Sequence, residues 1–407
     1  MNHKNFLKVF LSGLLSGIAS VLVILVFIVM SGKLDTSTGK VSNSKEYNNI
    51  LTRNIKEKSD IITSYIDKYY IGKIDSEKMS DSVYKGIVDG LDDKYAAYYT
   101  SDEYKEITEK SDGVYCGIGA YVTQNVTTGA ITIVRPMPNG PADKAGIKVG
   151  DIICAVDGTD ISGKDLTEVL SLVKGEKGSA VNLKIYRKGE KDYIDKKVIR
   201  DEIEEDTVSY KMLDDKIGYI RVTGFEAVTV KQFNKAVDKL EKKGEKALII
   251  DLRDNGGGLL DTAVKMLDRI LPKELVVYTK DKQGKAEEYY AKDNKKVSVP
   301  IAILVNENSA SASEVFAGAL QDYGVAKLVG TKTFGKGIVQ SIFNLTDGTA
   351  LKMTVAKYYT PKGRNIHEKG LTPDVRVTLN DKTTVQNESK LTIDNQMQKA
   401  INVLKKR

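Results

Sequence analysis

The chain opens with a long uninterrupted run of apolar residues. No charged side chain occurs from Val9 to Gly32, and this run is long enough for the roughly 20 residues that cross a bilayer as a helix. Lys4 and Lys8 precede it, so the positive-inside rule places residues 1–8 in the cytoplasm and the chain after Lys33 outside. A cleaved signal peptide is the competing interpretation, but the run exceeds a usual signal-peptide core and ends without an Ala-x-Ala-like site. We predict a retained single-pass anchor over 9–32.

A polar segment and then a helical pattern follow. Residues 33–46 are rich in Ser, Thr, Gly, Lys and Asp without an apolar period, which is typical of a solvated tether. In the next region, from Glu46 to Tyr99, apolar residues recur near helical spacing, which predicts two or three amphipathic helices. These positions are Ile61, Ile62, Tyr65, Ile66 and Tyr69, then Val83, Ile87, Val88 and Leu91.

Residues 110–200 alternate short β-branched runs with glycine turns, which is typical of strands. Two segments between these runs, 142–145 and 166–173, have helical character instead. Together they predict a compact, barrel-like β-sandwich.

Two later segments share a plan of apolar strand, polar turn and helix. Apolar strands that each lead into a helix imply a partly parallel sheet, in which ligands collect beyond the carboxyl ends of the strands. Both turns are expected at that edge. The first unit has a strand at 247–250, a turn at 251–258 and a helix at 259–271, and the second has a strand at 301–305, a turn at 306–308 and a helix that runs to about 323.

Composition excludes several classes of function. The 407 residues carry 62 Lys plus Arg and 55 Asp plus Glu, and this net charge of +7, without a long basic run, is weak support for nucleic acid and suits an anionic cell surface equally. We predict no nucleic-acid partner. The two histidines, His3 and His367, cannot build a multi-His zinc site. Cys116 and Cys154 are either small buried hydrophobes or a single disulfide, so we expect no metal and no cofactor.

The turn of the second unit carries three serines at a helix start, within 309–314. A serine there commonly caps the helix. A serine just inside such a turn also lies beside free N–H groups that can stabilise an oxyanion, so cap and nucleophile both stay open on this segment alone.

A lysine between two glycines follows at 335–337. Segment 330–337 nearly matches the phosphate-binding loop pattern, but it ends in Gly337 and leads into a strand-like run at 338–343 where a helix is needed. We therefore reject a nucleotide site. Lys336 is either an exposed lysine at a hairpin tip or, with no histidine to spare, a candidate base.

Several motifs in order carry a family resemblance. The β-rich stretch resembles a PDZ domain, and the chain from about Tyr47 to Leu379 resembles the carboxy-terminal processing proteases, serine peptidases with a PDZ domain and a Ser-Lys dyad. The PDZ-like motifs are Gly117–Ala120, Gly140–Ile147 and Gly150–Gly158. The protease-like motifs are Gly86–Asp92, Asp251–Gly258, Ser309–Glu314, Gly335–Gln340 and Tyr358–Gly363.

The resemblance assigns roles to single residues. It implies that Ser311 is the nucleophile, Lys336 the general base and Gln340 the residue that orients the lysine. Four positions apart on a strand, Lys336 and Gln340 would face the same side. Lysine is a base only when neutral, which requires burial or positive neighbours to bring its pKa down from about 10.4. His367 lies in a motif that the family also carries, and we interpret it as structural.

Backbone amides complete the predicted sites. The oxyanion hole is expected from the N–H of Ala312 and that of Gly256 or Gly257. In a PDZ-like site, a peptide adds to a sheet edge while loop N–H groups receive its terminal carboxylate. The loop residues are Gly117, Ile118, Gly119 and Ala120.

The chain departs from the family at the end of the PDZ helix. The typical Arg-Gly is Lys174-Gly175 here, and Cys116 stands in the carboxylate loop. If a basic residue there links PDZ occupancy to the active site, Lys174 would do so less rigidly, because an ammonium lacks the guanidinium fork.

We predict an α+β multidomain protein with an N-terminal transmembrane helix, a helical N-terminal region, a PDZ domain and an α/β protease core with crotonase-like ββα units. It would be a membrane-anchored, extracytoplasmic serine endopeptidase whose partners are proteins or peptides with flexible, apolar C-termini. The resemblance suggests that the helices from Glu46 to Tyr99, with a C-terminal segment at 392–404, pair two protomers into a homodimer. It leaves open an activating adaptor and a latent resting state. The alternatives are a PDZ-bearing membrane scaffold with an inactive protease fold and a crotonase-type acyl-CoA enzyme.

The expected boundaries are 1–8 N-terminus, 9–32 anchor, 33–46 tether, 47–109 helical region, 110–200 PDZ domain, 201–379 protease core and 380–407 C-terminal segment.

Overall fold

The computed structural model describes residues 53–292, 297–380 and 393–406, and the chain divides into two compact units after Ser76. The predicted anchor and tether lie outside the described residues. No described helix is long and apolar enough to cross a bilayer.

The first unit contributes one described helix, α3 (Arg53–Tyr69). Its apolar residues fall on one side as the spacing predicts, and Ile61, Ile62, Tyr65 and Tyr69 are all exposed.

The second unit begins with the remainder of the predicted helical region. Its elements are α4 (Ser76–Asp89), β1 (Ala97–Tyr99) and α5 (Ser101–Asp112). Thr100 and Glu103 form a capping box at the start of α5, and Gly113 ends the helix in a left-handed conformation. Lys85 of α4 pairs with Glu103 at 2.7 Å, which ties the two helices together. The apolar spacing thus predicted α3 and α4, whereas α5 lies beyond the stretch in which helices were expected.

The β-rich module follows, and it is largely one antiparallel sheet in the order β3-β4-β5-β7-β8. Strand β6 pairs with β5, and β2 pairs separately with β9. Both predicted helices form, as α6 and α7. The bounds are β2 (Val114–Gly117), β3 (Ala120–Gln124), β4 (Ile131–Pro136), α6 (Pro141–Lys144), β5 (Ile152–Val156), β6 (Thr159–Asp160), α7 (Leu166–Val173), β7 (Ala180–Tyr186), β8 (Ile194–Ile199) and β9 (Asp201–Glu204).

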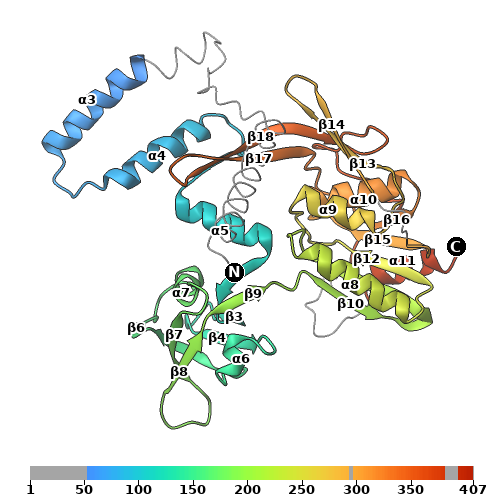
Figure 1. Ribbon diagram of the computed structural model, residues 1–407, viewed down its shortest axis with the longest axis horizontal. Coiled ribbons are helices and arrows are strands. Elements are labelled where there is room, and N and C mark those ends of the chain that lie inside the picture. The colour runs from blue at the N-terminus through green and yellow to red at the C-terminus, as the bar shows by residue number, and fades with distance from the viewer. Residues whose placement is uncertain (1–52, 293–296, 381–392, 407) are drawn as a thin grey trace, which may run out of the picture. The chain divides into compact units, whose positions relative to one another are not determined.

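The α/β core contains a second sheet in the order β10-β11-β12-β15-β16-β19 (Figure 1). Strands β11, β12, β15, β16 and β19 are parallel and β10 is antiparallel, so the predicted partly parallel sheet is confirmed. The bounds are β10 (Val208–Met212), a 3₁₀ turn (Asp214–Lys216), β11 (Ile217–Val222), α8 (Thr229–Lys242), β12 (Ala247–Asp251), α9 (Leu260–Asp268), β15 (Ile301–Val305), α10 (Ala312–Asp322), β16 (Ala326–Gly330), β19 (Val375–Arg376) and α11 (Asn395–Leu404).

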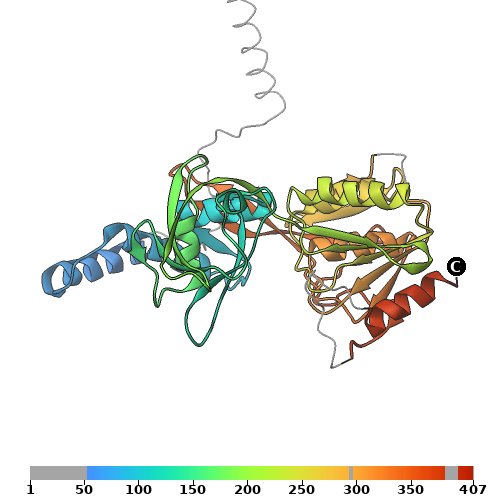
Figure 2. The same ribbon diagram turned by 90° about the horizontal axis from the view of Figure 1, so that it is seen from below.

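Both faces of this sheet are covered, because successive side chains of a strand point to opposite sides. Ile250 and Ile303 belong to the core formed with α8, α9 and α10, whereas Ile249 and Leu304 belong to the core formed with α11. Figure 2 shows α11, in red at the C-terminal end, on the opposite side of the sheet from α8. Helix α11 therefore buries its apolar face against its own sheet. That face is not free to pair with a second protomer.

The strand that follows Lys336, β17, belongs to a further, antiparallel sheet. Its order is β1-β18-β13-β14, with β17 also paired to β18. The expectation that Lys336 and Gln340 share one strand is wrong, because β17 begins at Ile338 and its register shifts between Val339 and Gln340. The bounds are β13 (Leu275–Asp281), β14 (Ala286–Tyr290), β17 (Ile338–Asn344) and β18 (Ala350–Tyr359).

Candidate active site

The three serines at the start of α10 have different environments. Ser309 Oγ donates to the Leu252 carbonyl at 2.7 Å, and Ser313 Oγ donates to the Asn255 carbonyl at 2.9 Å. Both serines are buried and brace the turn after β15 against the turn after β12. Ser311 instead lines a cavity of about 150 Å³.

Ser311 itself has an unusual backbone. Its φ of 55° and ψ of −116° fall outside the regions that L-residues ordinarily occupy, at the position directly before α10. Such strain persists only where the surroundings impose it, and it places a side chain at a sharp junction of strand and helix. A nucleophilic serine is commonly presented in this way.

Glycine is required opposite the serine. A Cβ on Gly257 would lie 2.7 Å from the Ala310 carbonyl oxygen and 2.9 Å from the Ala312 nitrogen, and the φ of Gly257 is 103°. The turn after β12 can approach the start of α10 only because that Cβ is absent.

The amides around the serine differ in their availability. Gly257 N–H donates to Asn255 Oδ1 at 2.9 Å and is engaged. Among the described residues, no acceptor is found for the N–H of Ala312 or of Gly258, and both residues line the cavity with Ser311. Ala312 and Gly258 therefore each offer an N–H without an acceptor beside Ser311, whereas the N–H of Gly257 is engaged. Gly256 does not line this cavity.

Glu314 is fully buried on the first turn of α10. It connects Ser311 to the loop of residues 331–337 between β16 and β17, which carries Lys336 and is called the lysine loop below. Its Oε2 accepts from the N–H of Ser311 at 3.0 Å and of Lys336 at 2.8 Å. Its Oε1 accepts from Thr333 Oγ1 and from the Gly335 N–H. Burial raises the pKa of Glu314, and these four donors oppose that rise.

The lysine loop is further held by Gly337 and Tyr358. A Cβ on Gly337 would lie 2.4 Å from the His367 nitrogen, so the segment that carries His367 packs directly on the loop. Tyr358 Oη lies within hydrogen-bonding distance of the carbonyl oxygens of Ser311, at 3.0 Å, and of Lys336. The backbones of the two predicted catalytic residues are thereby fixed to a common group.

The side chain of Lys336 is directed elsewhere. Its ammonium lies 4.6 Å from the centroid of the Tyr95 ring, in the segment before β1. Burial lowers the pKa of Lys336, the nearby Lys352 lowers it further, and Asp93 opposes both. No hydrogen bond joins Lys336 Nζ to Ser311 Oγ within the described part of the chain, and Lys336 does not line the cavity of Ser311.

Gln340 lies nearer the serine. It lines the same cavity as Ser311, and its Nε2 donates to Thr354 Oγ1 of β18 at 3.4 Å. The structure thus brings Ser311, Ala312 and Gln340 together at one cavity and leaves the Lys336 ammonium on Tyr95.

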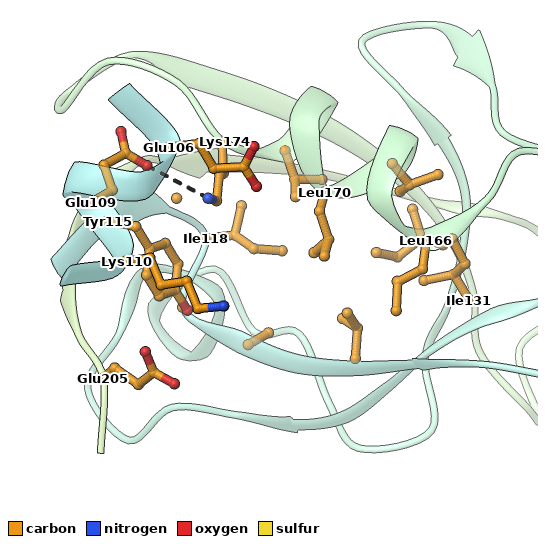
Figure 3. Close-up of a pocket in the computed structure, with 17 residues that line it drawn as sticks. Glu106, Glu109, Lys110, Tyr115, Ile118, Ile131, Leu166, Leu170, Lys174 and Glu205 are labelled. Carbon is orange, nitrogen blue, oxygen red and sulfur yellow. Dashed lines mark ion pairs between the residues drawn. The ribbon is translucent and has the colours of Figure 1, made fainter. Parts of the chain in front are cut away.

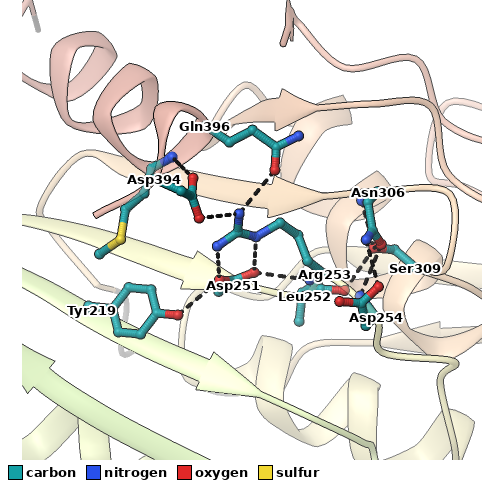
Figure 4. A network of polar contacts seen from close by, with 10 residues as sticks. Tyr219, Asp251, Leu252, Arg253, Asp254, Asn306, Ser309, Asp394 and Gln396 are labelled. Carbon is teal, nitrogen blue, oxygen red and sulfur yellow. Dashed lines mark hydrogen bonds and ion pairs between the residues drawn. The ribbon is translucent and has the colours of Figure 1, made fainter. Parts of the chain in front are cut away.

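A buried ion cluster supports the turn after β12 (Figure 4). Arg253 donates to both carboxylate oxygens of Asp251 and, through Nη1, to Asp394 at 2.7 Å and Gln396 at 3.0 Å. Asp394 also caps α11. The cluster joins the strand that leads to the glycine turn with the helix behind the sheet.

A second cavity, of about 280 Å³, lies in the β-rich module and is called the groove below (Figure 3). The predicted loop residues Gly117, Ile118, Gly119 and Ala120 all line it. The N–H groups of Ile118 and Gly119 donate to no acceptor among the residues that the structure describes. Apolar side chains from β4 and α7 form the walls, and they include Ile131, Leu166, Val169, Leu170 and Val173. Such a groove suits an extended chain with an apolar end and a terminal carboxylate.

Two regions of the chain match known domain families. Residues 216–377 match peptidase family S41, and residues 132–187 match the PDZ domain. The carboxy-terminal processing protease CtpA of Bacillus subtilis is 39% identical over 313 residues, which are 77% of this chain and 66% of that protein. A probable CtpA-like serine protease of Staphylococcus epidermidis is 38% identical over 363 residues, which are 88% of this chain and 73% of that protein. This chain belongs to the carboxy-terminal processing proteases.

The chain matches only part of the length of its relatives, and its identity to solved structures is lower. The chain spans between 62% and 73% of the length of the relatives it matches in Bacillus and Staphylococcus. Among solved structures, the photosystem II D1 C-terminal processing protease is 28% identical, with a TM-score of 0.47, over 82% of this chain and 88% of that one.

Sequence reasoning missed several residues of this processing-protease site. Glu314 could have been found, because Ser-x-x-Glu at a helix start is a capping signal. Gly258, Tyr358 and Tyr95 carry no such signal, since each reaches the site by tertiary packing. Cys116 and Cys154 are free and partly exposed. Both predicted alternatives, two buried hydrophobic residues and a single disulfide, are therefore wrong.

Proposed function

We propose that this processing protease is a membrane-anchored, extracytoplasmic serine endopeptidase that captures substrate tails in its PDZ groove and cleaves them with Ser311, Lys336 and Gln340. The observation that carries the proposal is Ser311 itself. It stands on a strained turn at a helix start, faces a cavity, and has the unengaged Ala312 N–H beside it. A nucleophile and an oxyanion donor need this arrangement.

The chemistry would proceed through an acyl-enzyme. Neutral Lys336 takes the proton of Ser311 Oγ as the oxygen attacks the peptide carbonyl carbon, and the N–H groups of Ala312 and Gly258 receive the negative charge that forms on the carbonyl oxygen. The Lys336 ammonium then gives the proton to the leaving amine as the C–N bond breaks. In the second half, water loses a proton to Lys336 and attacks the ester carbonyl, and the Lys336 ammonium returns that proton to Ser311 Oγ as the ester C–O bond breaks.

Lys336 has to leave Tyr95 for this step. The lysine side chain is long and its loop is fixed through Glu314, so rotation of the side chain towards Ser311 is the smallest change that forms the dyad. Gln340 lines the serine cavity, and in this proposal it accepts a hydrogen bond from the lysine after that rotation. The lowered pKa of Lys336 supports its role as base.

The wider setting of the enzyme is part of the same proposal. The apolar run at 9–32 would hold the N-terminus in the cytoplasm and the protease outside. The exposed apolar residues of α3 support a homodimer contact in the helical region. An activating adaptor that favours the rotated lysine would fit the same scheme.

The test compares the full-length wild type with Ser311→Ala and Lys336→Ala on an unstructured protein that ends in apolar residues. Mass spectrometry of the fragments should show cleavage by the wild type and a loss of roughly 10³-fold or more in each variant. Lys332→Ala, an exposed lysine of the same loop, is the matched control and should cleave normally. Cleavage that persists in Ser311→Ala would refute the assignment. A bound but uncut substrate, together with no labelling of Ser311 by a serine-reactive probe, would favour the scaffold alternative.

A further inference from the structure

One ion pair stands at the carboxylate end of the PDZ groove. Glu109, on α5, lies 3.5 Å from the ammonium of Lys174, the residue that directly follows α7 (Figure 3). Both side chains line the groove, and both are partly exposed, at 30% for Glu109 and 37% for Lys174. Helix α5 precedes the PDZ domain in the chain, so the pair brings an outside group to the binding site.

Lys174 is placed where a terminal carboxylate would bind. Its neighbour Gly175 donates to the Cys116 carbonyl at 3.3 Å, which holds Lys174 against the loop that starts at Gly117. The Lys174 ammonium also lies 5.5 Å from the centroid of the Tyr115 ring, which lines the same groove. Lys174, Ile118 and Gly119 line one groove, and a cation together with unengaged loop amides suits the binding of an anion.

The charged side chains that line the groove are of both signs. Three carboxylates, on Glu106, Glu109 and Glu205, line the groove, against two ammonium groups, on Lys110 and Lys174. A substrate carboxylate therefore enters a region with an excess of negative charge. Of the two lysines, Lys174 is the one already paired there with a carboxylate.

We propose that Glu109 imitates the substrate carboxylate: it occupies Lys174 until the terminal carboxylate of a tail displaces it. The inference rests on the proposed tail recognition and deepens it. Glu109 thus acts as a specificity-determining residue that weakens the binding of every tail with a free carboxylate. A tail without that charge cannot compete for Lys174, so its binding does not depend on Glu109.

The magnitude follows from the exposure of the pair. Partly exposed ion pairs contribute little, so removal of the Glu109 charge should tighten the binding of a free carboxylate by about two- to fivefold. The same change should leave an amidated tail unaffected.

The experiment uses the full-length chain with Ser311→Ala, so that no probe is cut. Two fluorescein-labelled peptides of one sequence end in valine, one with a free carboxylate and one amidated, and fluorescence anisotropy gives each Kd. Glu109→Gln should tighten only the carboxylate peptide. Glu106→Gln removes the same charge about one turn earlier on α5 and lines the same groove without pairing with Lys174, so it should tighten the carboxylate peptide less.

A double variant checks the mechanism. In a Lys174→Gln background the carboxylate peptide should bind more weakly, and the gain from Glu109→Gln should shrink. An unchanged Kd in Glu109→Gln, an equal gain in Glu106→Gln, or an equal gain for the amidated peptide would each overturn the inference while tail recognition stands. If no variant binds the carboxylate peptide, the tail recognition of the proposed function fails, and the inference fails with it.

Discussion

At the scale of single residues, the site is organised around one buried carboxylate. Glu314 has two oxygens and receives four donors, and the oxygen Oε2 alone receives both the Ser311 and the Lys336 amides. An amide side chain could not replace it, because its NH₂ group would have to face one pair of donors. The carboxylate thus sets the distance between the two predicted catalytic backbones, although it faces neither reacting group.

The environment of Lys336 predicts a pH dependence. Burial and Lys352 lower the pKa of Lys336, and only the neutral amine can act as base. A plot of kcat/KM against pH should therefore have a rising limb with its midpoint below 10.5, the ordinary pKa of lysine. Lys352→Met removes a positive neighbour, so the pKa of Lys336 should rise and the limb should move to higher pH. The measurement is kcat/KM across pH for the wild type and this variant.

Two controls separate this dependence from other causes. Lys332→Met removes an exposed charge of the same loop and should leave the limb in place. His367→Ala should also keep it, because the lysine alone titrates as the base. Loss of the limb in His367→Ala would contradict the Ser-Lys assignment.

At the scale of elements, Asp394 serves two structures at once. It caps α11 by accepting from Met397 N–H at 2.8 Å, and it pairs with the buried Arg253 at 2.7 Å. Asp394→Ala should destabilise the core by about 3 kcal/mol or more, because a cap is lost and a buried guanidinium loses a partner. Asp165→Ala removes only the cap of α7 and should cost about 1 kcal/mol. Urea unfolding measures the free energy of unfolding of both variants. Equal losses would show that the ion cluster adds no stability beyond that of the helix cap.

The elements themselves were mostly predictable. The strand-turn-helix units that end in α9 and α10 follow from apolar runs of fixed length, and α7 was predicted with the bounds Leu166–Val173 that it has. The strand β17 was expected, but its bulge before Gln340 was not, because a register shift depends on the partner strand rather than on local pattern. The contact of Lys336 with Tyr95 joins segments far apart in sequence and had no signal for the same reason.

At the scale of the whole molecule, one stretch of the helical region touches both sites. Tyr95 contacts the Lys336 ammonium, and Glu109 contacts Lys174 of the PDZ groove. Between them lie β1, which pairs with β18 of the core, and the capped start of α5. The segment from Tyr95 to Glu109 is therefore structurally part of the peptidase.

The predicted anchor would also set the orientation of the molecule in the membrane, and the two free cysteines allow a test of that prediction. Cys116 and Cys154 are partly exposed and should lie outside the membrane, so a membrane-impermeant maleimide should label them on intact cells. Burial raises the pKa of Cys154, so its labelling should be the slower of the two. In a chain without these cysteines, Asn2→Cys should react only after permeabilisation, because the positive-inside rule holds residues 1–8 in the cytoplasm. Labelling of Asn2→Cys on intact cells would show that the N-terminus is outside and would overturn the orientation.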